Sequence, residues 1–304
     1  MNCVELENVT KQYGSHKAVN TLDLAVPEGS VCGFIGPNGS GKTTTIRMIL
    51  HIIQPDTGSV SVLGESGIRA ANDSIGYLPE ERGMYKKMPL KRQITYFGSL
   101  KGMTRSAAAK VADDWLEKLD LTKWANHKIE ALSKGMAQKA QFISAVVASP
   151  KLLILDEPFS GLDPVNLEVL RSAILEMREQ GTTIIFSTHD MSMAEKMCDS
   201  IFMIYQGNKV LDGTLDNIQS KYGTDTIRLL TESQTDIGPL PGVVNSVRDG
   251  RYQLLNLAPD ADTRQILSQI IAKDNIKHFE IAKPSLHDIF IRIAGPEAKE
   301  ANHE

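Results

Sequence analysis

A glycine-rich loop limits this chain to a small set of folds. The loop consists of Gly36, Pro37, Asn38, Gly39, Ser40, Gly41, Lys42 and Thr43. It follows an apolar run at Ser30–Ile35, which we expect to be a strand, and precedes an expected helix at Lys42–His51. Such a loop points backbone N–H groups inward, and the helix adds its positive end. The sequence therefore predicts a phosphate-binding loop in an α/β fold, with Lys42 reaching the β- and γ-phosphates and the Thr43 hydroxyl ligating Mg²⁺.

A second constraint is the apolar run from Lys151 to Leu155, which ends in Asp156 and Glu157. A continuous apolar run is typical of a buried parallel strand, and ligands bind beyond the carboxyl ends of such strands. We therefore expect Asp156 to hold Mg²⁺, directly or through water, and Glu157 to act as a general base on water. The plain alternative is a strand that ends in a solvated acidic turn, which the phosphate-binding loop disfavours.

Ser133 begins a third segment, in which Gly135 and an apolar helix follow. The spacing predicts that Ser133 caps a helix that runs to about Ser149, where Pro150 ends it. The start of such a helix is also an anion site. Taken alone, the segment favours simple capping, because most serine caps have no other role.

Together these segments resemble the ATP-binding-cassette (ABC) ATPases, and the resemblance covers residues 2–220. It implies a P-loop fold with a RecA-like core, an antiparallel β subdomain and a helical lobe that carries the Leu132-Ser133 signature. The implied ligands are ATP and Mg²⁺. By resemblance, Tyr13 stacks on adenine, His189 senses the γ-phosphate, and residues 160–163 communicate across a dimer. The nucleotide-binding residues then also include Pro37, Asn38, Ser40, Thr44, Ser133 and Gly135; the metal-binding residues are Thr43, Glu80 and Asp156; and the catalytic residues are Lys42, Glu157 and His189.

Three positions depart from the usual pattern of this family. Lys134 and Met136 replace the third and fifth residues of the commonest signature, and Glu80 stands where glutamine is usual. Lys134 adds a cation near the phosphate, and Met136 lacks the amide of glutamine. Ser133 and Gly135 are kept. Because Lys42, Asp156, Glu157 and His189 are all present, we expect activity to be retained.

The resemblance also implies partners. Each ATP site is completed by Ser133 and Gly135 of a second ABC ATPase subunit, identical or related, in a head-to-tail dimer. Transport then requires a separate integral-membrane permease, and the chain is expected at the inner face of the cell membrane. The segment Pro284–Phe290 resembles the C-terminal ending of NatA-type cassettes of the sodium- and drug-export subfamily, which favours export.

Composition agrees with a cytoplasmic enzyme. A net charge of -4 and a pI near 6.0 give no general case for nucleic-acid binding. No apolar run reaches the length of a membrane span, and the N-terminus lacks the parts of a signal peptide. The three cysteines have neither metal nor disulfide spacing. The basic clusters Lys86–Lys87 and Lys91–Arg92 are either a solvated face or a partner contact.

The pattern shifts suggest two domains. Residues 1–220 form the ATPase domain, with a helical lobe at about 86–150. Residues 221–294 form a small α+β domain, with strands at 227–230, 243–247, 252–257 and 278–281, and helices at 263–272 and 285–293. This domain is either a structural brace or a regulatory sensor. Residues 295–304 are expected to be a disordered tail.

Two other functions remain open at this point. One is a soluble ABC ATPase that acts on ribosomes or nucleic acid, although such proteins usually carry two cassettes or a long coiled coil. The other is a non-catalytic regulatory cassette, which the intact Asp156, Glu157 and His189 disfavour.

Overall fold

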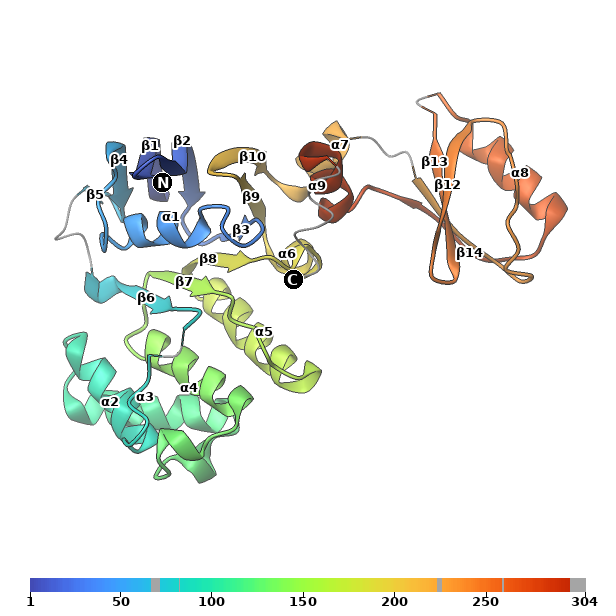
Figure 1. The fold of residues 1–304 in the computed structure, drawn as a ribbon. Coiled ribbons are helices and arrows are strands. Elements are labelled where there is room, and N and C mark those ends of the chain that lie inside the picture. The colour runs from blue at the N-terminus through green and yellow to red at the C-terminus, as the bar shows by residue number, and fades with distance from the viewer. Residues whose placement is uncertain (67–71, 82, 223–225, 259, 296–304) are drawn as a thin grey trace. The chain divides into compact units, whose positions relative to one another are not determined.

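The computed structural model describes residues 1–66, 72–81, 83–222, 226–258 and 260–295 (Figure 1). The chain forms two compact units, Met1–Gly213 and Thr214–Glu304. The division lies a few residues before the boundary expected from the sequence, and the exact domain limits stay a prediction. Of the expected disordered tail, residues 296–304 lie outside the described residues.

A six-stranded sheet is the centre of the first unit. Across the sheet the strands are β10 (Asn208–Gly213), β9 (Ser200–Tyr205), β3 (Val31–Ile35), β8 (Thr183–Thr188), β7 (Leu152–Asp156) and β6 (Ile75–Leu78). All neighbours are parallel except β10 and β9. Every residue of β3, β7 and β8 is buried, as the continuous apolar runs predict. The carboxyl ends of these three strands carry the glycine-rich loop, Glu157 and His189, which brings these groups to one edge.

A four-stranded antiparallel sheet packs against one face of this core. Its order is β2 (His16–Pro27), β1 (Asn2–Tyr13), β4 (Thr57–Val62) and β5 (Glu65–Ser66). Alternate residues of β1 and β2, such as Leu6 and Leu24, are buried together with Ile46 and Ile49 of helix α1 (Lys42–Ile49). The central strands contribute Phe34 to the same cluster. The glycine-rich loop therefore leads into a helix that is held between two sheets.

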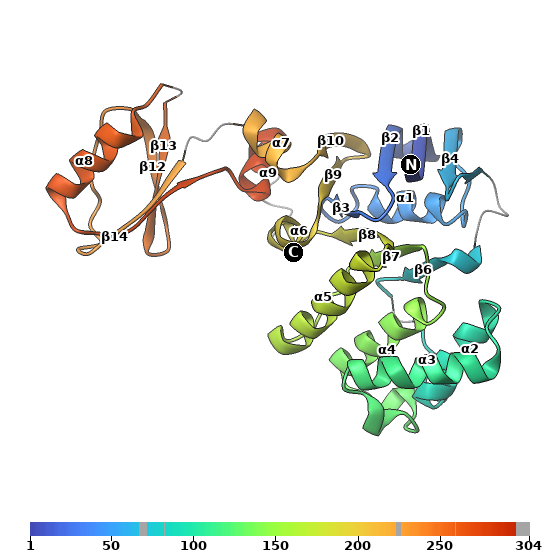
Figure 2. The same cartoon turned by 180° about the vertical axis from the view of Figure 1, so that it is seen from behind.

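A helical lobe is inserted between β6 and β7. It contains α2 (Leu90–Leu100), α3 (Arg105–Lys118) and α4 (Lys134–Val146), and Figure 2 shows the three helices beside one another. Their apolar residues, including Leu116 and Phe142, share a core with Leu155 of β7 and with Leu170 and Ile174 of α5 (Pro164–Glu179). This is the face of the sheet opposite α1. A shorter helix, α6 (Met191–Met197), follows His189.

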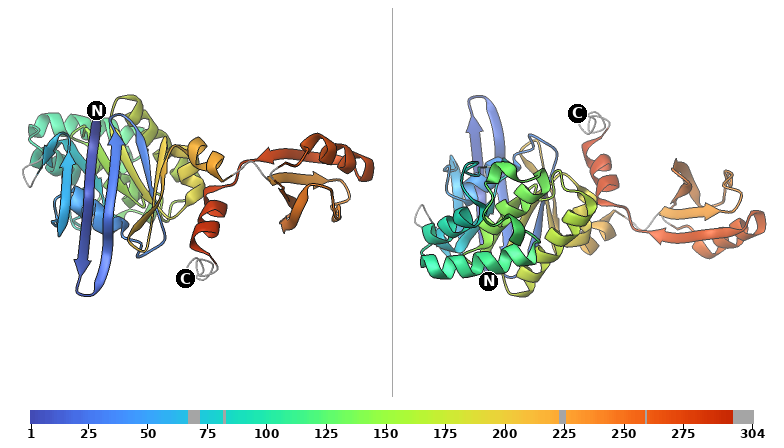
Figure 3. Two further views of the ribbon diagram at one scale, coloured as in Figure 1. Left: turned by 90° about the horizontal axis from the view of Figure 1, so that it is seen from above. Right: turned by 90° about the horizontal axis from the view of Figure 1, so that it is seen from below.

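The second unit contains a four-stranded antiparallel sheet with a helix on one face (Figure 3). The strand order is β12 (Val243–Asp249), β13 (Tyr252–Leu257), β11 (Thr226–Thr231) and β14 (Ile276–Ala282). Helix α8 (Thr263–Lys273) buries Ile266 and Ile270 against Leu229 and Leu255. Helices α7 (Leu215–Lys221) and α9 (Leu286–Ala294) complete the unit, and Gln219 Nε2 donates to the Pro284 carbonyl over 3.0 Å. The small α+β architecture expected from the sequence is present.

Candidate functional site

The glycine-rich loop has a backbone that only glycine can follow at two positions. Gly41 has a φ of 113°, and a Cβ there would collide with the carbonyl oxygen of Ala18. A Cβ at Gly36 would collide with the Ile204 carbonyl oxygen. The loop is thus wedged against β2 and β9. Lys42 Nζ donates to the carbonyl oxygens of Gly36 at 2.6 Å and Pro37 at 3.1 Å, so its side chain lies along the loop.

The loop opens into a cavity of about 430 Å³. Three structural groups line this cavity: the loop with the start of α1, the β1–β2 hairpin, and the acidic ends of β6 and β7. The lining residues are Tyr13, His16, Ala18, Asn38, Gly39, Gly41, Lys42, Thr43, Thr44, Glu80, Asp156 and Glu157. Most of the residues expected from the sequence therefore converge on one cavity.

Buried charges dominate the electrostatics of the cavity. Burial lowers the pKa of Lys42, while the nearby Glu157, Asp156 and Glu80 oppose this shift. Burial also raises the pKa of Asp156, and the neighbouring carboxylates Glu80 and Glu157 raise it further. Three carboxyl groups around one ammonium group give the cavity an excess of negative charge. A cation that enters with an anionic ligand would relieve this repulsion.

The donor set around the loop suits Mg²⁺. Thr43 offers a hydroxyl, and Asp156 and Glu80 offer carboxylates, which are the hard oxygen donors that this ion takes while keeping several waters. Across the described residues, no three His, Cys, Asp or Glu side chains form a metal site of their own. Ser40 Oγ is buried and finds no hydrogen-bond partner among the described residues, so the loop still has a polar atom to satisfy.

Glu157 is the most firmly held carboxylate at the site. Its Oε1 accepts from the backbone N–H of His189 at 2.9 Å and lies 2.7 Å from His189 Nδ1. Thr188 Oγ1 donates to Oε2 over 3.2 Å. The backbone of Glu157 has a φ of 48°, which is unusual for a residue with a side chain. The loop after β8 thus fixes the carboxylate in one orientation at the edge of the cavity.

Ser133 and Gly135 lie elsewhere in the chain and do not line this cavity. Ser133 caps α4, and its Oγ accepts from the Met136 N–H at 3.3 Å, as the sequence predicts. The side chain of Lys134 lies across Gly161, so closely that a Cβ on Gly161 would collide with it. Gly135 faces Leu162. Within one chain the signature segment therefore packs on residues 160–163.

Sequence reasoning missed several residues around the site. His16 and Ala18 line the cavity, and His16 pairs with Tyr13 across the β1–β2 hairpin. The Gly14–Ser15 turn next to Tyr13 was the available signal for this hairpin. Gln138 and Gln141 of α4 are buried, and their amides donate to the backbone next to Glu157 and Glu80. No local pattern distinguishes these two amides from surface glutamines.

Comparisons with known proteins agree with this geometry. The family model for ABC transporters matches residues 19–160, and the model for the C-terminal domain of DrrA1-3-like ATP-binding proteins matches residues 213–294. The chain is 41% identical to the uncharacterised ABC transporter ATP-binding protein YhaQ of Bacillus subtilis, over 95% of this chain and 98% of that protein. It is 29% identical to Nod factor export ATP-binding protein I of Burkholderia lata, over 98% of both chains.

A solved ATP-binding subunit of an ABC transporter superposes on the chain with a TM-score of 0.68 at 28% identity, covering 73% of this chain and 93% of that one. No helix in the described ranges is both long and apolar enough to cross a membrane. The full-length match to YhaQ and the two family models lead to one conclusion: the chain belongs to the ATP-binding proteins of ABC transporters and carries a DrrA-like C-terminal domain.

Proposed function

We propose that this protein hydrolyses ATP as the energising subunit of an exporter, in a head-to-tail dimer on a separate membrane permease. The observation that carries the proposal is the orientation of Glu157. Its carboxylate is fixed by Thr188 and His189 at the edge of the cavity that also contains Lys42 and Asp156. A general base, a phosphate-binding cation and a metal-binding carboxylate are thus gathered at one place.

The residues of the cavity divide the task between them. The loop N–H groups and Lys42 bind the phosphates, and Tyr13, half exposed at the end of β1, stacks on the base. Thr43, Asp156 and Glu80 would hold Mg²⁺, which would screen the phosphate charge. Glu157 orients water and takes its proton, since its carboxylate lines the cavity and is held in place by Thr188 and His189. His189 positions Glu157 through two contacts, and we assign it the role of γ-phosphate sensor.

We place Ser133 and Gly135 of a second subunit at the nucleotide, since neither residue lines the cavity of its own chain. In a head-to-tail pair, the start of α4 from one subunit closes over the nucleotide held by the other. The packing of Lys134 on Gly161 links that helix start to residues 160–163 of its own subunit. Hydrolysis removes the γ-phosphate contacts and lets the pair open.

A surface on the helical lobe supports the permease contact. Tyr85, Tyr96 and Leu100 are exposed there, and the rings of Tyr85 and Tyr96 meet edge to face at 6.2 Å. A neighbouring hollow is lined by Lys86, Lys87 and Arg92. Aromatic residues and arginine are enriched at protein interfaces, and Tyr85, Tyr96 and Arg92 are of these types. The export direction and the location at the inner face of the membrane rest on the likeness to Nod factor export and DrrA-like proteins.

The test is Glu157→Gln, which keeps the shape of the side chain but removes the base. We expect phosphate release to fall by about 10²–10⁴-fold, while Mg-ATP binding is kept and a dimer accumulates in size-exclusion chromatography. Glu179→Gln, at the far end of α5, is the matched control and should behave as the unaltered protein.

The same variant tests the partner. Tagged Glu157→Gln protein, recovered from its own cells after gentle solubilisation with Mg-ATP, should carry a multi-span membrane protein with it. If Glu157→Gln released phosphate at the normal rate, Glu157 would not be the general base. Recovery with ribosomes or nucleic acid alone would instead favour a soluble ABC ATPase.

A further inference from the structure

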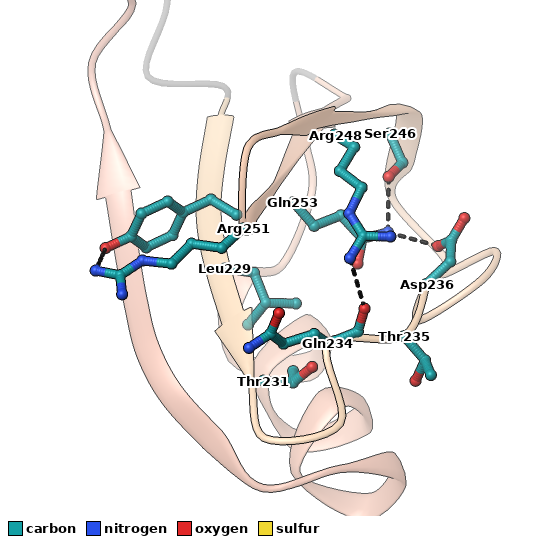
Figure 4. A pocket seen from close by; sticks show the side chains of 10 residues that line it. Leu229, Thr231, Gln234, Thr235, Asp236, Ser246, Arg248, Arg251 and Gln253 are labelled. Atoms are coloured by element: carbon teal, nitrogen blue, oxygen red, sulfur yellow. Dashed lines mark hydrogen bonds between the residues drawn. The ribbon is translucent and has the colours of Figure 1, made fainter.

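A small polar cavity lies at one end of the sheet in the second unit (Figure 4). Its volume is about 110 Å³. Strands β11, β12 and β13 contribute Thr231, Arg248 and Gln253, and the loop after β11 contributes Thr235 and Asp236. None of these residues belongs to the ATP site, so the ATPase mechanism leaves the cavity without a role.

The loop that closes the cavity is held in a fixed conformation. Gln234 has a φ of 55°, in the left-handed region that residues with side chains seldom adopt. Its carbonyl oxygen accepts from Arg248 Nη2 at 2.9 Å, which ties the loop to β12. A conformation of this kind persists only where its surroundings enforce it, and it is often found at binding sites. The wall of the cavity is therefore built before a ligand arrives.

Gln253 fixes the second wall. Its Nε2 donates to Asp236 Oδ1 at 2.5 Å and to Ser246 Oγ at 2.8 Å, and its Oε1 accepts from the Ile237 N–H at 3.3 Å. Both amide hydrogens are therefore used within the protein. Figure 4 shows these bonds converging between β12 and the loop. Gln253 thus positions Asp236 and is not itself free to hold a ligand.

Three charged residues line the cavity, Arg248, Arg251 and Asp236, and Arg251 turns toward the Tyr252 hydroxyl. Arg248 and Asp236 keep unused bonding capacity. Arg248 has five N–H donors, and the one hydrogen bond it forms with described residues is that to Gln234. Asp236 Oδ1 accepts from Gly238 and Gln253, while Oδ2 has no bond with any residue in the described ranges. The hydrogen bonds from Gly238 and Gln253 and the charge of Arg248 lower the pKa of Asp236, which keeps it ionised.

We propose that this cavity binds a small α-amino acid as a zwitterion, with the ligand carboxylate on Arg248 and the ligand ammonium on Asp236. A guanidinium group matches a carboxylate with two parallel hydrogen bonds, and a carboxylate accepts well from an ammonium. A simple anion would meet the charge of Asp236, and a simple cation would meet that of Arg248. The small volume and the hydroxyls of Thr235 and Ser246 favour a short side chain, as in glycine, alanine or serine.

The direct test is equilibrium dialysis of the full-length protein with radiolabelled glycine, L-alanine and L-serine. We expect saturable binding of at least one of them with one molecule per chain. L-Lactate, which lacks the ammonium group, and ethanolamine, which lacks the carboxylate, should bind at least tenfold more weakly. The proposal is overturned if none of the three amino acids binds at millimolar concentration, or if L-lactate binds as tightly as L-alanine.

Variants locate the site. Arg248→Gln and Asp236→Asn should each weaken binding by about ten- to a hundredfold, since each removes a charged hydrogen-bond partner. Arg264→Gln is the matched control, because Arg264 is exposed at the start of α8 and is not among the residues that line the cavity. An equal loss in Arg264→Gln would refute the assignment.

A second pair of measurements guards against misfolding. Arg248→Lys keeps the charge but not the forked donor, so it should retain part of the affinity that Arg248→Gln loses. Hydrogen exchange of the β11 and β13 amides should be the same in every variant as in the unaltered protein, because these strands are in the centre of the sheet of the second unit. A variant that loses this protection is misfolded, and the affinity of Arg248→Lys then decides the assignment.

Discussion

Cys32 is the second residue of β3, and its thiol is closed off from solvent. Burial raises the pKa of Cys32 to about 12, from an ordinary value of 9.0. The thiol therefore stays protonated in the folded protein at pH 8, and a protonated thiol is a poor nucleophile. We expect iodoacetamide to leave Cys32 unmodified in the native protein and to modify it in urea, as peptide mass spectrometry would reveal.

The raised pKa of Cys32 makes the free energy of unfolding depend on pH. Between pH 9 and pH 12 the unfolded chain loses the Cys32 proton while the folded chain keeps it, so the free energy of unfolding falls as the pH rises. Urea midpoints measured at pH 8 and pH 10 should fall less in Cys32→Ala than in the unaltered protein. Rapid native alkylation at pH 8 would show that β3 opens locally.

Single residues differ in how far the sequence reveals them. Lys42 and Asp156 are readable because their roles depend on neighbours along the chain. The contact between Glu157 and His189 joins residues at the ends of different strands, so only the folded sheet shows its length. The position of Lys134 on Gly161 was not foreseen, because it depends on how α4 and the loop before α5 approach each other.

Helix α9 begins with a reciprocal cap. Ser285 Oγ accepts from the Asp288 N–H at 3.1 Å, while Asp288 Oδ2 accepts from the Ser285 N–H at 3.1 Å. Ser285→Ala should destabilise this helix by about 0.5–2 kcal/mol, and Ser285→Thr should retain most of the stability. Hydrogen exchange of the α9 amides is the measurement. Equal protection in Ser285→Ala and the unaltered protein would contradict the role of the cap.

Helices and strands with a local sequence signal could be predicted. Strands that are defined only by hydrogen bonds to a neighbouring strand could not. The buried strands β3, β7 and β8 are read from continuous apolar runs, and α4 and α9 from their serine caps. Strand β2 alternates at Leu22, Leu24 and Val26, a signal that was present but not used. Strand β5 has two residues and is defined only by its pairing with β4, which no periodicity reveals.

At the scale of the whole molecule, each unit has its own core. The two large apolar clusters of the first unit end at Ile204, and that of the second unit begins at Ile227. Residues 1–213 expressed alone should therefore fold and bind Mg-ATP with an affinity within a few-fold of the full chain. Calorimetric melting with and without Mg-ATP is the measurement. An aggregated or nucleotide-insensitive fragment would show that the second unit is needed for the first.

The α/β class and the presence of a second small domain follow from the sequence, because motif order and pattern shifts act over long stretches. The insertion of the helical lobe between the neighbouring strands β6 and β7 was known only through the family resemblance. The secondary-structure propensities of single residues do not reveal the order in which strands lie across a sheet. The polar cavity of the second unit is invisible in the sequence, since its walls come from three strands and a loop.

Two buried glutamine side chains connect α4 to the backbone next to the cavity. Gln138 Nε2 donates a hydrogen bond to the Pro158 carbonyl at 2.9 Å, and Gln141 Nε2 donates one to the Pro79 carbonyl at 3.1 Å. Pro158 follows Glu157 in the chain, and Pro79 precedes Glu80. Helix α4 is therefore hydrogen-bonded to the backbone beside two acidic residues of the cavity. Because Gln138 and Gln141 belong to one helix, we expect a displacement of α4 to move the backbone beside both acidic residues together.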